Sequence, residues 1–212
     1  MKFTRPVTPA EVSSDLRALI EEIAPSQVPL YVDVEPLPDA PSDECFALVD
    51  FMLEQQGGQA VVGWSIWEFP SLFVEGEFHC VWRRPDGRLV DVAPKKAECR
   101  RILFLPDLHR HYEGRQVSNL RRPIHIEPVL EAYLASFDAE FELMNRGERA
   151  TQHGEIRLTG AEAAEFARIQ EIRGSTHLSL SARFPTVGPY HPCPCGSGKK
   201  VKWCHREAAN AA

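Results

Sequence analysis

Apolar residues recur at intervals of three and four along four segments of the chain, and this spacing is typical of helices that bury one face. The segments are 10–24, 42–56, 127–146 and 161–173. Each is followed by a proline or a glycine, residues that commonly end helices. In the second segment, Ser42 or Asp43 is the expected N-cap. The pattern therefore predicts four helices, with Cys45 in the first turn of the second.

Other segments are short and rich in β-branched and aromatic residues, which favours strands. They cover residues 31–34, 60–67, 77–83, 88–92 and 103–105. Between the third and the fourth lies Arg84-Pro85-Asp86-Gly87, with a proline and a glycine where a type I turn closed by a left-handed residue needs them. We therefore expect an α+β fold, in which a central antiparallel sheet packs on the Cys45 helix and the other helices surround it.

Composition supports one main core with a small appendage. The 212 residues are 43% hydrophobic and 25% charged, the balance of an ordinary globular protein. We expect a main domain at 1–174, a proline- and glycine-containing linker at 175–192 and a small motif at 193–206. No run of about 18 apolar residues and no secretory signal is found, so no membrane span is expected and the predicted location is the cytoplasm.

Charge is distributed unevenly between these parts. Residues 191–212 carry a net charge of +3, whereas the remainder carries −9. The acidic body argues against general nucleic-acid binding, so nucleic acid is expected only at the basic tail, which would also suit an acidic protein surface.

The tail contains a dense group of metal-ligand residues, Cys193, Cys195, Cys204 and His205. Four such ligands satisfy the tetrahedral preference of Zn²⁺ and leave no open position for substrate, so the sequence predicts a structural zinc site. A segment of this size buries too little apolar surface to fold alone, and zinc would supply most of its folding free energy.

The residues Cys193-Pro-Cys195-Gly-Ser-Gly-Lys, followed by Cys204-His205, closely resemble the SEC-C motif, the zinc tail of the translocase motor SecA. The resemblance implies that Cys193, Cys195, Cys204 and His205 bind zinc. It also implies a protein partner for the tail, such as a chaperone or the ribosome.

A second group of residues suggests nucleophilic chemistry in the body. A thiol in the first turn of a helix faces the positive end of the backbone dipole, which favours its reactive thiolate form. Cys45 is predicted at such a position. If Pro85-Asp86-Gly87 forms a three-residue loop, Val81 lies opposite Asp91, and His79 and Asp91 become diagonal neighbours on one face of the hairpin.

The order of a helix-borne cysteine, a strand with His79 and a strand with Asp91 resembles the transglutaminase-like branch of the papain-type fold. The resemblance covers residues 43–94 and includes Glu77-Phe-His-Cys-Val-Trp82 and Gly87-Arg-Leu-Val-Asp-Val-Ala-Pro94. It implies Cys45 as the nucleophile, His79 as general base and acid, and Asp91 as the residue that orients His79. The implied reaction is acyl transfer or amide hydrolysis.

Two functions follow as alternatives. The first is a cysteine-dependent enzyme that the zinc tail targets to its substrate. The second is a non-catalytic adaptor whose enzyme-like body and zinc tail both bind protein partners. The reactivity of Cys45 and its distance from His79 distinguish the two.

Overall fold

The computed structural model describes residues 6–42, 44–95, 99–152, 156–183, 190, 199–200 and 203. Its elements, in chain order, are α1 (Ser14–Ile23), β1 (Leu30–Val34), α2 (Cys45–Gln56), β2 (Gln59–Phe69), β3 (Phe73–Arg83), β4 (Leu89–Asp91), β5 (Arg101–Pro106), β6 (Leu120–Pro123), α3 (Pro128–Met144), a 3-10 helix (Gly147–Thr151) and α4 (Gly160–Arg183). The α+β class is as predicted.

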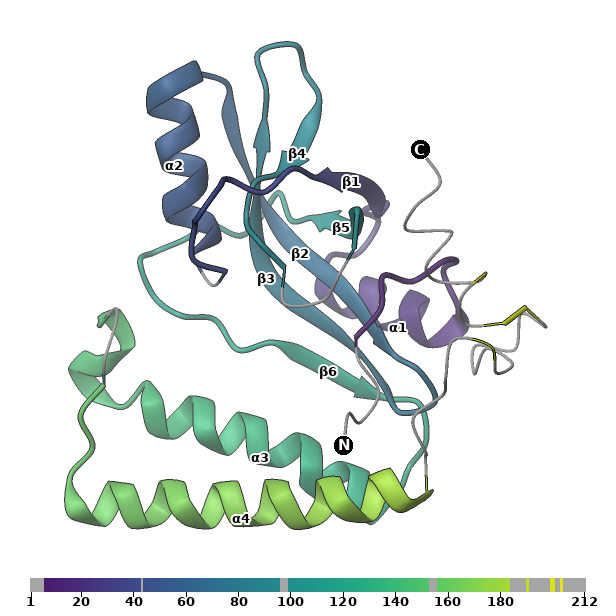
Figure 1. The fold of residues 1–212 in the computed structure, drawn as a ribbon, viewed down its shortest axis with the longest axis vertical. Coiled ribbons are helices and arrows are strands. Elements are labelled where there is room, and N and C mark those ends of the chain that lie inside the picture. Colours follow the sequence, from purple (N-terminus) through teal and green to yellow (C-terminus); the bar gives the residue numbers. More distant parts are fainter. Residues whose placement is uncertain are drawn as a thin grey trace.

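The sheet is closed, which the sequence pattern did not predict. Its strand order is β2-β5-β1-β4-β3-β6, and β2 also pairs with β3 along the full length of both strands. Five strands therefore form a small barrel, and β6 pairs with the first residues of β3, 73–76 (Figure 1). The expectation of an antiparallel sheet is wrong for one pair, because β1 and β4 run parallel. Closure satisfies the backbone groups that an open sheet would leave unpaired at its edges.

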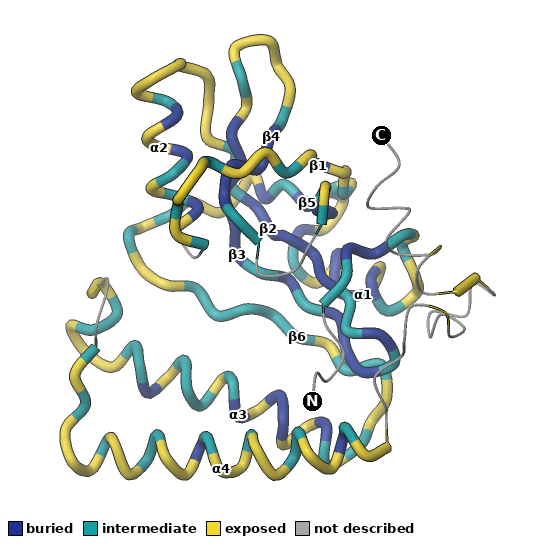
Figure 2. Tube along the Cα trace, in the orientation of Figure 1, coloured by how far each residue is buried: buried dark blue, intermediate teal, exposed yellow. Residues whose placement is uncertain are grey.

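Alternation of side chains along the strands separates the inside of the barrel from its outside. The inner residues form a cluster without any helix residue: Val32, Trp67, Val81, Ile102 and Phe104. On the outer face, α1 packs against Trp64, Ile66 and Phe78, and α2 packs against Cys80, Trp82 and Val90. Figure 2 shows burial concentrated in the barrel strands.

Strand β6 was missed because its sequence, Leu-Arg-Arg-Pro, has little strand character. Arg121 in this strand lies 2.6 Å from the carboxylate of Glu75 in β3, and their backbones pair directly. Tertiary pairing with β3 therefore outweighs a weak local preference.

The C-terminal helix is longer than expected. We predicted that it ends at Gly174, but α4 continues to Arg183, so residues 175–183 of the predicted linker are helical. A glycine inside a helix costs about 1 kcal/mol relative to alanine. Packing on α3 offsets this cost, because Leu180 is fully buried and the Arg173 side chain donates to the Ser136 carbonyl at 2.7 Å. The rest of the predicted linker, except Tyr190, lies outside the described residues.

Candidate cysteine–histidine–aspartate site

The β3–β4 hairpin has the register that the sequence predicted. The Arg84 N–H donates to the Arg88 carbonyl at 2.9 Å, and Gly87 takes the left-handed conformation with φ of 90°. Trp82 pairs with Val90, so counting back along both strands places Val81 opposite Asp91. The loop therefore fixes the side chains of His79 and Asp91 on the inner face of the barrel.

These two side chains form a buried ion pair. His79 Nε2 lies 3.1 Å from Asp91 Oδ2, and the side chains are 3% and 0% exposed. The other carboxylate oxygen, Oδ1, accepts a hydrogen bond of 3.0 Å from the Ala93 N–H. Asp91 is thus oriented by its own backbone turn and in turn orients the imidazole.

Cys45 is the first residue of α2, as expected, but the predicted cap is wrong. Glu44 is the N-cap residue, and no described side chain caps the helix. The Cys45 side chain is buried and lies close enough to His79 to help raise the pKa of that imidazole. The structure pairs His79 with Asp91 and places Cys45 near them at the start of α2.

The approach of Cys45 differs from the expected one. We predicted that the face of the hairpin bearing His79 packs toward the start of the helix, whereas α2 packs mainly on the opposite face, against Cys80 and Trp82. Among the described pairings, β3 meets β4 only at residues 82–83 and β6 only at 73–76, so residues 77–81 have no paired strand on that edge.

Lys95 is a member of the site that the sequence analysis missed. Its Nζ lies 2.6 Å from Asp91 Oδ2 and 3.1 Å from His79 Nε2, and its side chain is only 9% exposed. Lys95 and Lys96 are adjacent cations in the sequence. Sequence alone offers no signal that one of them turns inward, because that depends on the path of the chain after Pro94.

The charges of the site raise the pKa of His79 and lower the pKa of Asp91. Burial and the Lys95 ammonium lower the pKa of His79, but the Asp91 carboxylate and the nearby Cys45 outweigh them and raise it from 6.5 to about 9. Burial raises the pKa of Asp91, but His79 and Lys95 outweigh burial and hold it below its usual value of 3.8. His79 is therefore an imidazolium and Asp91 a carboxylate at neutral pH.

The segment after β5 borders the cysteine. Tyr112 stacks on Phe46, the neighbour of Cys45, with ring centroids 3.8 Å apart, and burial together with nearby Cys45 raises the pKa of the Tyr112 phenol. The start of this segment is fixed, since Trp64 Nε1 donates to the Asp107 carboxylate at 3.1 Å. The stacked rings of Phe46 and Tyr112 therefore lie near the thiol.

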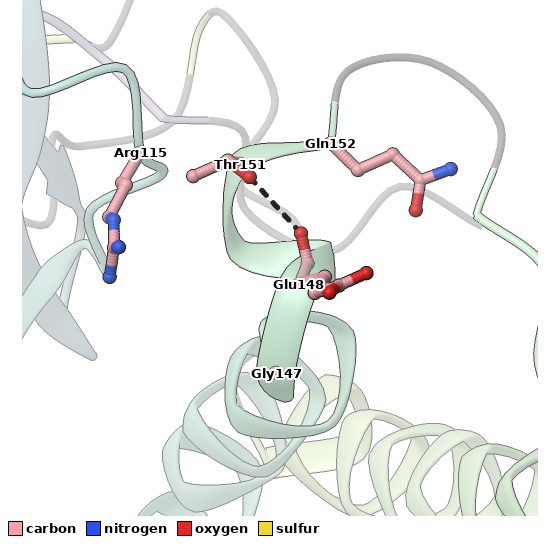
Figure 3. A pocket seen from close by; sticks show the side chains of 5 residues that line it. All are labelled: Arg115, Gly147, Glu148, Thr151 and Gln152. Carbon is pink, nitrogen blue, oxygen red and sulfur yellow. Dashed lines mark hydrogen bonds between the residues drawn. The ribbon is translucent and has the colours of Figure 1, made fainter.

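A surface hollow lies elsewhere, around the 3-10 helix. Arg115, Gly147, Glu148, Thr151 and Gln152 line it (Figure 3). Within this hollow, the Thr151 hydroxyl donates a hydrogen bond of 3.1 Å to the Glu148 carbonyl. None of the three predicted catalytic residues lines this hollow.

The predicted zinc ligands Cys193, Cys195, Cys204 and His205 lie outside the described residues. Within the described part of the chain, no group of three or more His, Cys, Asp or Glu side chains is arranged to hold a metal ion. The zinc site therefore stays a prediction. Likewise, no helix in the described part is long and apolar enough to cross a membrane.

Comparison with known proteins shows similarity to the protein translocase subunit SecA. The chain is 33% identical over 119 residues to SecA of Ralstonia pickettii, which covers 56% of this chain and 12% of that protein. It is 33% identical over 119 residues to SecA of Cupriavidus metallidurans, and 42% identical over 60 residues to SecA of Burkholderia vietnamiensis, with 11% and 6% of those proteins covered.

The chain spans about a tenth of the length of the first of these relatives. A segment of it is therefore SecA-related, which agrees with the SEC-C resemblance at a coarse level. No protein-family model and no solved structure matches the chain. The transglutaminase-like resemblance remains a prediction.

Proposed function

We propose that the body of this protein is a cysteine-dependent acyl-transfer or amide-hydrolysing enzyme, and that its C-terminal segment is a zinc-binding SEC-C tail that recruits it to a protein partner. The observation that supports the catalytic part best is the buried pair of His79 and Asp91, 3.1 Å apart, with Cys45 close enough to help raise the pKa of His79. A thiol, an imidazole and an orienting carboxylate in this order are the components of a cysteine nucleophile.

The reaction follows from these groups. In the reactive state the thiol proton lies on His79, so Cys45 attacks the carbonyl carbon of an amide as a thiolate; a C–S bond forms, and His79 gives its proton to the departing nitrogen as the C–N bond breaks. The resulting thioester is then attacked by water or an amine, whose proton His79 accepts as the C–S bond breaks and the Cys45 thiolate leaves. In this proposal the backbone N–H groups of the first turn of α2, which have no partner within the helix, stabilise the oxyanion.

The test compares the reactivity of the body cysteines. Iodoacetamide should label Cys45 at least about tenfold faster than Cys80, because burial and the nearby Cys45 raise the pKa of Cys80 to about 12. An activated acetyl ester should leave an acetyl group on Cys45, detected by peptide mass spectrometry. The His79→Gln variant should lose both reactions, whereas His109→Gln, at an exposed loop position, should keep them.

Equal labelling of Cys45 and Cys80, or equal behaviour of the two histidine variants, would contradict the enzyme and favour the adaptor. The adaptor has one structural observation in its favour: the Cys45 side chain is only 8% exposed. In that case the buried polar site would serve stability, and the body would bind partners through its surface.

The zinc tail is tested separately. Four ligands of this type fit Zn²⁺, which when bound would fold the short tail. Zinc should copurify with the chain, and Cys195→Ser should remove it while the thermal unfolding of the body stays unchanged. Cys99→Ser, outside the motif, should retain the metal. A variant that keeps its zinc, or loses the unfolding transition of the body along with it, would refute this modular arrangement.

The similarity to SecA supports a partner in protein translocation, since the matched proteins are translocase subunits. The basic character of residues 191–212 favours an acidic surface on that partner.

A further inference from the structure

We propose that Lys95 is a positioning residue for the Cys45–His79 pair. Its ammonium group shares the Asp91 carboxylate with His79 and so makes the His79 imidazolium a stronger acid. The catalytic consequence rests on the proposed function. The electrostatic effect on His79 does not, and can be measured without any substrate.

The geometry makes the two cations compete for one oxygen. Asp91 Oδ1 is occupied by the Ala93 N–H, so Lys95 and His79 both approach Oδ2, at 2.6 and 3.1 Å. Lys95 Nζ and His79 Nε2 are themselves only 3.1 Å apart. Two positive charges at this separation, with little solvent around them, repel each other strongly.

A count of charges shows what Lys95 changes. With Lys95 present, the Asp91 carboxylate keeps a cationic partner even when His79 has lost its proton. Without Lys95, His79 is the one cation beside this buried carboxylate among the described residues. Loss of the imidazole proton to a leaving group would then strand that carboxylate unpaired, which is costly in a buried site. Lys95 thus lets His79 act as an acid.

Among the described residues, few other charged groups act on this cluster. Asp91, Lys95 and Cys45 are the groups whose interactions shift the titration of His79. Cys99 is close enough to Lys95 and Asp91 for both charges to act on it, while its own burial raises the pKa of its thiol. The Cys99 thiol is therefore neutral at neutral pH and does not compensate for the loss of Lys95.

The experiment is a titration of His79 by ¹⁵N-detected NMR in the full chain, with the resonance assigned by its absence in His79→Gln. The variant Lys95→Met keeps the length of the side chain and removes its charge. The pKa of His79 should rise by about one unit or more in this variant. Lys95→Arg, which keeps the charge, should leave it within a few tenths of a unit of the wild type.

An unchanged or lowered pKa of His79 in Lys95→Met would overturn the proposal, and so would an equal shift in Lys95→Arg. If Lys95→Met fails to fold, Lys95→Gln provides the same comparison with a polar, uncharged side chain. In acyl transfer by Cys45, the alkaline limb of the pH profile should move upward with the pKa. A shifted titration in a chain whose Cys45 is unreactive would refute the enzyme and still uphold the role of Lys95.

Discussion

Replacing Gly63 with alanine should destabilise the barrel by more than about 3 kcal/mol, the upper range for overpacking. A Cβ atom at this position would lie 2.2 Å from the Leu105 carbonyl oxygen and 2.9 Å from Pro106 Cα. Both obstacles are backbone atoms of β5, which pairs with β2 at this point. They can yield only if the two strands separate, and that would open the barrel. Gly63 is therefore required for close approach of two backbones.

Gly76→Ala is the matched control on the same hairpin. Its Cβ would meet Ile23 Cδ1 at 2.7 Å, but this atom is the far end of a flexible side chain that can rotate away. We expect a cost below about 1.5 kcal/mol for this variant. Urea unfolding followed by circular dichroism measures both. If the two variants were equally stable, the backbone contact at Gly63 would not limit closure of the barrel.

Replacing Asp91 with alanine should cost about 3–5 kcal/mol at neutral pH, the range observed when one partner of a buried ion pair is removed. The variant leaves His79 and Lys95 facing each other across 3.1 Å with no carboxylate between them. It also leaves the Ala93 N–H without its buried acceptor. The double variant Asp91→Ala/Lys95→Met should recover part of the loss, because only one of the two cations then remains. If the double variant is less stable than the single one, the repulsion is not the main cost.

The stability lost in the Asp91→Ala variant should depend on pH. The pKa of His79 in the folded chain, about 9, exceeds its ordinary value of 6.5, so the stability it contributes is complete below pH 6.5 and is lost as the pH rises through 9. The pKa of Asp91 is instead lowered, so its contribution is present above 3.8 and is lost as the pH falls through the lower folded value. The gap between wild type and Asp91→Ala should therefore narrow above pH 9. Stability curves at several pH values test this.

The sequence by itself determined the features that depend on near neighbours. Helical spacing located α1, α2 and α3, and the Pro85-Asp86-Gly87 loop was enough to set the register that places His79 and Asp91 on one face. Cys45 could be placed at the start of a helix for the same reason. Such features follow from local backbone preferences and from side-chain alternation, which act over a few residues.

Tertiary structure decided the rest, because the deciding contacts join residues that are distant in the chain. Closure of the barrel requires β5 to reach β2, and the parallel pairing of β1 with β4 depends on the path between them. Helix α4 continues past Gly174, where local preference predicts a helix end, because it packs on α3. The proximity of Lys95 and of Cys45 to His79 likewise depends on how the assembled elements pack. No local pattern encodes them, since their energies come from burial and charge within the assembled barrel.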